Sequence, residues 1–385
     1  MNPKMRVHWM ILVLLASILP TSGCGTGERA EALFEPTPTP GRVRIGTPVE
    51  ITIDESVGCF YGRAIENDVL IGQARQANDL QPVVVNLTTG EANRLDVEGI
   101  RLSTEAVRYV AQVRDIEPRA NLAELLVHDL SEGKILTVAA GQLRRPYIFD
   151  NVVVWEEYSG GGRNIYGYDL SQKRHFTVAE GKGSRIDPQT DGTWVVYLFQ
   201  DPEEQPLHTL RAHHIPTGKD FEIGLMPINP GDYPPGRFRI SSNRIAWIGI
   251  KRGEIHLYGL ETRTDEVIFK DERVYAVLGS LDMEDNLLIW GGTEQGKVGY
   301  DLVHHQMFDI PDIPEEVRGQ TSSSTEFISE EYVVWLVEES DPLSRYLMTP
   351  PPPGEPMPTP PPELVAEAEA NKCRRRLFVA PITRE

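Results

Sequence analysis

Residues 146–178 read PYIFDNVVVWEEYSGGGRNIYGYDLSQKRHFTV, and this stretch decides the fold. It contains four short runs rich in β-branched and aromatic residues, at 146–149, 152–157, 164–170 and 175–178. Asn151 and the glycines at 160–162 separate these runs, and such residues are typical of turns. The stretch therefore predicts four consecutive antiparallel strands.

The second run ends in an aromatic residue, Trp155, and that ending recurs along the chain. Across seven units the same position is assigned to Gly72, Tyr109, Trp155, Tyr197, Trp247, Trp290 and Trp335. The Tyr168-Asp169-Leu170 ending of the third run also recurs, as Tyr300-Asp301-Leu302. A period of roughly 40 to 50 residues is that of a four-stranded propeller blade.

We therefore predict an all-β chain folded as a β-propeller of seven blades, each with four antiparallel strands. The second run of each unit is apolar on both faces rather than alternating, which indicates a sheet packed between two neighbours. Six blades are the alternative, because Gly72 and His213-His214-Ile215 depart from the repeat in the first and fourth units.

The last unit predicts how the ring closes. It supplies runs at 326–329, 332–337 and 376–380 and then ends one strand short. The β-type residues at 44–53 belong to no other unit, so we expect this N-terminal strand to complete the last blade and leave no open edge.

This pattern resembles the TolB-like propeller repeat of bacterial envelope proteins: an apolar run ending in Trp, then Ile-Tyr-x-Tyr-Asp-Leu, then a glycine-containing turn. The resemblance covers residues 43–385, where we place a single propeller domain. Members of that family act mostly as binding or scaffolding modules, so the resemblance implies a binding role without naming a ligand.

The first 42 residues predict export and anchoring. Residues 1–23 have basic Lys4 and Arg6 followed by an apolar run too short to span a bilayer, as in a signal peptide. The sequence Thr21-Ser22-Gly23-Cys24 resembles a bacterial lipoprotein box, which implies lipid on Cys24. The Pro/Thr-rich segment 24–42 reads as a tether. We expect a lipid-anchored protein outside the cytoplasm, although an ordinary secretory signal stays an alternative.

Charge limits the partners. Residues 1–23 hold two basic and no acidic side chains, so the rest of the chain carries 36 basic against 57 acidic residues, a net charge of −21. This disfavours nucleic acid, whose phosphates need an excess of Lys and Arg. We expect an envelope protein or an envelope glycan as partner, besides the membrane that holds the lipid.

Cys59 and Cys373 form an even pair once Cys24 carries lipid. Both fall near the closing seam of the predicted ring, so they are disulfide candidates in an oxidising compartment. Their spacing is not that of a metal site. Adjacent histidines on a strand, His213-His214 and His304-His305, point to opposite faces, so we expect neither metal nor cofactor.

Two loops are binding candidates, since loops between the second and third strands and between blades share one face. Residues 226–236 are stiffened by proline and present Asp232 and Tyr233, which suits recognition at low entropic cost. The proline-rich insertion at 341–372 can form a polyproline II segment that docks into aromatic grooves. For both loops a purely connecting role is the alternative.

No catalytic residues are assigned. The chain has no Gly-x-Ser-x-Gly nucleophile elbow. Glycan hydrolysis is the alternative to a binding role, because it needs two opposed carboxylates. Candidates for such a pair are Glu156, Glu157, Asp201, Glu203 and Glu204.

Overall fold

The computed structural model describes residues 42–53, 59–66, 68–76, 79–94, 101–103, 108–117, 121–159, 161–201, 207–227, 238–249, 254–270, 281–293, 296–318, 321–339, 359–363 and 375–384. All of them belong to one compact unit, Gly41–Glu385. Cys24, Asp232, Tyr233, Cys373 and most of the 341–372 insertion lie outside the described residues.

The described part of this unit is built almost entirely from antiparallel sheets. The first two sheets contain β3 (Cys59–Glu66), β4 (Val69–Gln76), β5 (Asp79–Asn86) and β6 (Ala92–Arg94), then β7 (Arg101–Ser103), β8 (Tyr109–Glu117), β9 (Leu122–Asp129) and β10 (Lys134–Gly141). The next eight strands are β11 (Leu143–Phe149), β12 (Val152–Ser159), β13 (Gly162–Asp169), β14 (Arg174–Ala179), β15 (Ser184–Thr190), β16 (Trp194–Gln200), β17 (Leu207–His214) and β18 (Lys219–Pro227).

The last three sheets complete the repeat. The fifth and sixth sheets contain β19 (Phe238–Ser241), β20 (Arg244–Ile248), β21 (Glu254–Gly259) and β22 (Thr264–Lys270), then β23 (Leu281–Glu284), β24 (Leu287–Thr293), β25 (Gly296–Asp301) and β26 (Gln306–Asp309). A short helix, α1 (Glu315–Arg318), precedes the last strands, which are β27 (Thr321–Ile328), β28 (Tyr332–Glu339) and β29 (Arg375–Arg384).

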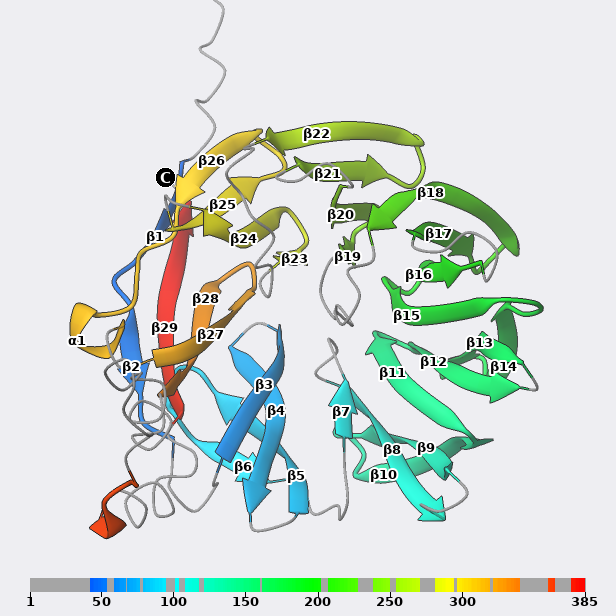
Figure 1. Cartoon of the computed structure of the whole chain (residues 1–385), viewed down its shortest axis with the longest axis horizontal. Helices are drawn as coiled ribbons and strands as arrows, with labels where there is room; N and C mark the ends of the chain where they lie inside the picture. The colour runs from blue at the N-terminus through cyan, green and yellow to red at the C-terminus, as the bar shows by residue number, and fades with distance from the viewer. Residues whose placement is uncertain are drawn as a thin grey trace, which may run out of the picture. The chain divides into compact units, whose positions relative to one another are not determined.

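Strands β11–β18 form one eight-stranded sheet, and among the described residues a single parallel pair, Arg163 with Ser184, joins its two halves. Counted separately, these halves are the third and fourth sheets, so the described residues form seven units, consistent with the predicted number. The innermost strands contact one another in succession, β7 with β11, then β15, β19, β23, β27, β3 and β7 again. The sheets follow one another around a common centre (Figure 1), and this is the predicted β-propeller.

The N-terminal residues complete the seventh sheet, in two pieces rather than one. β1 (Val43–Ile45) and β2 (Val49–Ile51) both pair antiparallel with β29. Gly46 lies between them, and a Cβ there would overlap the ring of Pro381. Arg376 on β29 donates from Nε to Glu50 Oε1 at 2.7 Å and so adds an ion pair to this seam.

The core lies between neighbouring sheets, because each second strand is buried on both faces as predicted. Val152, Val153, Val154 and Trp155 are all buried on β12. The aromatic side chain at this position packs against the preceding unit: Trp155 faces the second sheet, Trp247 the fourth and Trp290 the fifth.

One assignment in this repeat was wrong. Tyr109 begins β8 and pairs with Asp129, as Val152 pairs with Asp169, so the residue equivalent to Trp155 is Gln112. The sequence misleads here because a polar residue occupies the position. Gln112 is fully buried. Its Oε1 lies 2.6 Å from Nε2 of His128, which satisfies the amide oxygen, whereas its Nε2 has no hydrogen-bond partner among the described residues.

The Tyr-Asp-Leu ending marks a tight turn between the third and fourth strands. Asp301 Oδ1 accepts hydrogen bonds from the backbone N–H of Val303 and His304, at 2.8 and 3.1 Å. Asp129 does the same with Ser131 and Glu132. A carboxylate at this place therefore caps the turn, which explains the recurrence of Asp there.

Candidate functional site

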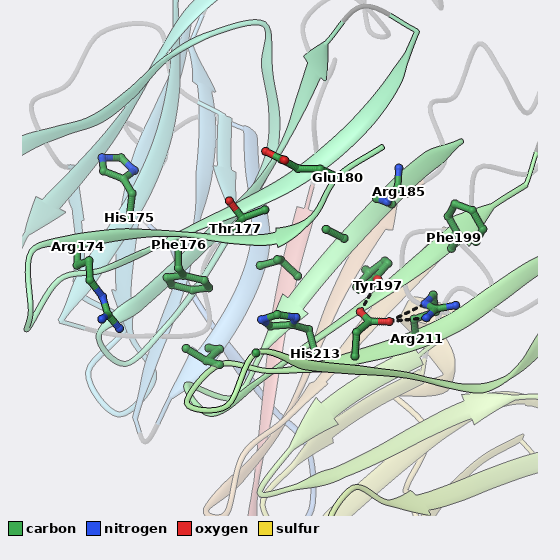
Figure 2. Close-up of a pocket in the computed structure, with 15 residues that line it drawn as sticks. Arg174, His175, Phe176, Thr177, Glu180, Arg185, Tyr197, Phe199, Arg211 and His213 are labelled. Atoms are coloured by element: carbon green, nitrogen blue, oxygen red, sulfur yellow. Dashed lines mark hydrogen bonds and ion pairs between the residues drawn. The ribbon is translucent and has the colours of Figure 1, made fainter. Parts of the chain in front are cut away.

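A cleft of about 810 Å³ opens between the third and fourth sheets (Figure 2), and its volume is in the range of ligand sites. Every residue of β14 lines one wall. The opposite wall comes from the fourth sheet, with Arg185, Tyr197, Phe199, Arg211, His213, Ile215 and Asp220 among its lining residues. The cleft therefore combines aromatic surface with polar side chains.

The residue at the repeated aromatic position differs at this interface. In the fifth, sixth and seventh sheets, tryptophan fills the boundary with the preceding unit. The fourth sheet has the smaller Tyr197 there, packed in the cluster that joins the third and fourth sheets. A smaller side chain leaves space that a tryptophan would fill.

The Tyr197 hydroxyl organises the wall of the fourth sheet. It donates to Oδ2 of Asp220 at 2.6 Å, and Nε of Arg211 donates to Oδ1 of the same carboxylate at 2.8 Å. Figure 2 shows both side chains converging on that carboxylate. Burial raises the pKa of Tyr197 above its ordinary value, so the phenol stays protonated and remains a donor. Three side chains from three strands are thus held in fixed positions.

His213 lies beside this group and is only 6% exposed. Its Nδ1 is buried and has no hydrogen-bond partner among the described residues. Burial lowers the pKa of His213 below its ordinary value, so the imidazole is neutral near pH 7 and offers one donor and one acceptor. A buried polar atom without a partner is costly unless something else binds it.

Aromatic rings stand on both walls. Phe176 of β14 lies across Gly167, its partner on β13, where a Cβ would overlap the ring. Phe199 of β16 lies beneath Arg185, whose guanidinium carbon is 5.0 Å from the ring centroid. Arg185 also donates to the carbonyl of Gly181 at 2.8 Å and to that of Lys182 at 3.1 Å, so it holds the loop between the two sheets.

A buried charged group joins the same two sheets nearer the centre. Glu156 on β12 is 0% exposed, and its Oε1 accepts the backbone N–H of Asp187 on β15 at 2.8 Å. Its Oε2 accepts Nη1 of Arg163 at 3.0 Å, and Nε of Arg145 lies 3.7 Å from Oε1. Glu156 therefore acts as a bridge between sheets.

Arg145 and Asp187 occupy equivalent bulges, each before a proline and each with positive φ, 46° and 57°. Nη1 of Arg145 lies 3.5 Å from Oδ1 of Asp187. Burial raises the pKa of Asp187 to about 6, and its Oδ2 is buried without a hydrogen-bond partner among the described residues. Such strained, charged positions show where the inner ends of the two sheets are fixed.

The carboxylates considered for hydrolysis do not form one site in the described residues. Glu156 is buried and both of its carboxylate oxygens already have partners, while Glu157, next along β12, is partly exposed. Asp201 is partly exposed at the end of β16, and Glu203 and Glu204 lie outside the described residues. Cys59 begins β3, but its pairing with Cys373 also falls outside the described part of the chain.

His214 and His304, one histidine from each pair, have local partners. His214 Nδ1 lies 2.8 Å from Oγ1 of Thr217, and His304 Nδ1 lies 2.9 Å from Oδ2 of Asp301. His304 and His305 lie in a turn rather than on the strand that we expected. Among the described residues no three His, Cys, Asp or Glu side chains gather as metal ligands would.

Sequence reasoning missed most of the cleft. It identified Tyr197 as an aromatic position and His213 as a structural histidine, but it gave no role to Phe176, Arg211 or Asp220. The usable signal was the tyrosine at a position where tryptophan recurs. No helix in the part of the chain that the structure describes is both long and apolar enough to cross a membrane.

No protein-family model matches the chain, and no curated protein is similar to it in sequence. Solved structures share its fold. The β-propeller domain of the Trilobed protease from Pyrococcus furiosus is 12% identical, with a TM-score of 0.50 over 74% of this chain and 90% of that one. An acylaminoacyl peptidase from Pyrococcus horikoshii is 10% identical, with a TM-score of 0.49 over 74% of this chain and 50% of that one.

TolB from Acinetobacter baumannii is 12% identical, with a TM-score of 0.39 over 59% of this chain and 58% of that one. At these identities the likeness to the Trilobed protease domain concerns the fold alone. It agrees with the strand topology, and the predicted β-propeller is confirmed.

Proposed function

We propose that the protein is a binding module without catalytic activity, held outside the cytoplasm by lipid on Cys24. Its partner is an envelope protein or an envelope glycan. The observation that carries this proposal is the cleft between the third and fourth sheets, where Tyr197 and Arg211 fix the Asp220 carboxylate beside two aromatic rings. Few, well-positioned polar groups in an aromatic lining are typical of recognition sites.

The state of Glu156 supports binding over hydrolysis. A glycosidase needs an acid and a base on either side of the scissile bond, both open to the substrate. Glu156 is fully buried and bonded to Arg163 and to the Asp187 backbone. Glu156 therefore cannot serve with its neighbour Glu157 as the accessible acid and base of a glycosidase.

A capture experiment tests the binding function. The full chain, purified in detergent, is immobilised and exposed to envelope extract, and retained proteins and glycans are identified by mass spectrometry. The control is Tyr197→Trp, which places in the fourth sheet the residue found at the equivalent position of the third and fifth. We expect the native chain to retain a partner that Tyr197→Trp does not, with both proteins showing the same circular dichroism.

Release of new reducing ends from an envelope glycan by the native chain would contradict the non-catalytic proposal.

The lipid anchor has its own test. Cys24→Ser should move the protein from the membrane fraction to the soluble extracytoplasmic fraction, because one lipidated residue supplies the attachment. Retention of Cys24→Ser in the membrane fraction would refute lipid anchoring.

A further inference from the structure

We propose that the cleft between the third and fourth sheets is a saccharide site that takes a neutral sugar residue. The proposal rests on the proposed binding function and names its ligand class. Four observations lead to it: the aromatic faces, the fixed polar groups, the balance of charge and the geometry of β14.

The aromatic faces suit the apolar C–H surface of a pyranose ring. Phe176 and Phe199 come from opposing walls (Figure 2), and both are partly exposed. Gly167 beneath Phe176 leaves room for its ring, while Arg185 covers Phe199. Both rings are therefore positioned before a ligand arrives, which lowers the entropic cost of binding.

The polar groups suit hydroxyls, which donate and accept at once. The Asp220 carboxylate has further lone pairs beyond those used by Tyr197 and Arg211, and it can accept from a ligand hydroxyl. Arg211 shows two of its five N–H donors engaged, both on Asp220, among the described residues. Neutral His213 offers the donor and acceptor pair that a hydroxyl also needs.

Charge in the described lining is nearly balanced, since three arginines stand with two carboxylates and two of the arginines already have partners, which favours a neutral ligand. Arg211 is paired with Asp220, and Arg185 is bonded to backbone carbonyls. Arg174, at the start of β14, lies opposite Asp169 on β13. A phosphate or a uronic acid would be held best by a cation without other partners, whereas Arg185 and Arg211 are already engaged.

The geometry of β14 disfavours a peptide as the occupant. An extended peptide would add to the free edge of β14 by a regular ladder of backbone hydrogen bonds. In the pairing of β14 with β13, however, Ala179 is opposite Ile165 and Thr177 opposite Tyr166, so Val178 forms a bulge. A bulge interrupts the ladder and twists the edge, whereas a sugar needs no ladder.

The test measures saccharide binding with a matched pair of variants. Asp220→Asn removes the carboxylate of the cleft. Asp265→Asn removes the equivalent carboxylate of the fifth sheet, which binds Nδ1 of His256 at 3.0 Å and does not line the cleft. The full chain in detergent is titrated by calorimetry with cellotetraose, maltotetraose and tetra-N-acetylchitotetraose, with tetragalacturonate as the acidic probe.

We expect saturable binding of at least one neutral tetrasaccharide. Asp220→Asn should weaken that binding about ten-fold or more, because a hydrogen bond to a charged group is lost. Asp265→Asn should bind as the native chain does. Tyr197→Trp should also weaken binding, because it removes the hydroxyl that donates to Asp220 and places a larger ring in the wall. It provides a second variant if Asp220→Asn folds poorly.

Two results would overturn the saccharide site: no neutral tetrasaccharide binds at millimolar concentration, or binding is equal in Asp220→Asn and Asp265→Asn. Preferred binding of tetragalacturonate would likewise refute the neutral class. If the chain captures a protein from envelope extract but binds no sugar, the saccharide site is refuted and the proposed binding function remains supported.

Discussion

Replacement of Glu156 by glutamine tests whether the third and fourth sheets are joined by a buried ion-pair group. The 3.0 Å contact between Glu156 and Arg163 corresponds to a Coulomb energy of about 5 kcal/mol at an effective dielectric constant of 20, before desolvation is subtracted. Removing one partner of a buried pair costs about 3–5 kcal/mol. Glutamine keeps the size and one acceptor, so we expect Glu156→Gln to lower the free energy of unfolding by about 3 kcal/mol.

Glu157→Gln is the matched control, because it makes the same change one residue along the same strand. Glu157 is partly exposed, so this variant should change stability by about 0.5 kcal/mol or less. Both variants are unfolded in urea at pH 8, with tryptophan fluorescence reporting on Trp155 beside the substitution. A loss in Glu156→Gln below about 1 kcal/mol, or equal to that in Glu157→Gln, would refute the bridging role.

Three further predictions concern single contacts. Because burial raises the pKa of Asp187 from 3.8 to about 6, the folded chain holds this proton more tightly than the unfolded chain, and the free energy of unfolding falls by about 3 kcal/mol as pH rises from about 4 to 6. Asp187→Asn should remove this fall in urea titrations at pH 4.5 and 7, and an unchanged pH dependence would contradict the prediction. The hydrogen bond from Arg376 lowers the pKa of Glu50, so its stabilisation is present above pH 4.5 and is lost as pH falls through the lowered folded pKa. Glu50→Gln should cost about 0.5–1 kcal/mol at pH 7 and less at pH 3, and equal losses at both would count against the seam ion pair. Gly167→Ala and Gly299→Ala each place a methyl group against a cross-strand phenylalanine, so each should lower the free energy of unfolding by about 1–3 kcal/mol, measured by thermal unfolding. Only Gly167→Ala should weaken ligand binding, because Phe176 lines the cleft and Phe308 does not, and equal effects on binding would refute the placement of Phe176.

The fold could be predicted because its repeat is carried by local chemistry. Val152 to Trp155 is apolar at every position, and the strand is buried on both faces. The turn after Asp169 has its cap in the sequence, since the carboxylate accepts from the backbone of Gln172 at 2.9 Å. These features need only neighbouring residues, so they can be read without knowledge of distant contacts.

The error at Tyr109 shows where such reading fails. A buried Gln112 stands in place of an aromatic residue, and its amide oxygen has a partner in His128, 16 residues away in sequence. Without that partner the position looks exposed, and the assigned strand slipped by three residues. Polar substitutions at core positions depend on contacts between strands, which sequence periodicity does not report.

The cleft could not be predicted for the same reason. Asp220 stands one turn after the His213-His214 pair, in a run of polar residues that reads as a solvated hairpin. Its role depends on Arg211 across the hairpin and on Tyr197 one strand further, a convergence that follows from register. Tyr197 was assigned to the repeated aromatic position, but the space beside it is a property of the packed interface.

The two features that join the third and fourth sheets have a common consequence for binding. Near the centre, the Glu156 bridge and the Arg163–Ser184 pair make one eight-stranded sheet out of two units. Farther out, the same two units separate around Tyr197 and form the cleft. Because these contacts join both walls, we expect the cleft to keep its width when empty and a ligand to meet side chains that are already in place. This is the physical reason to look for recognition at this boundary.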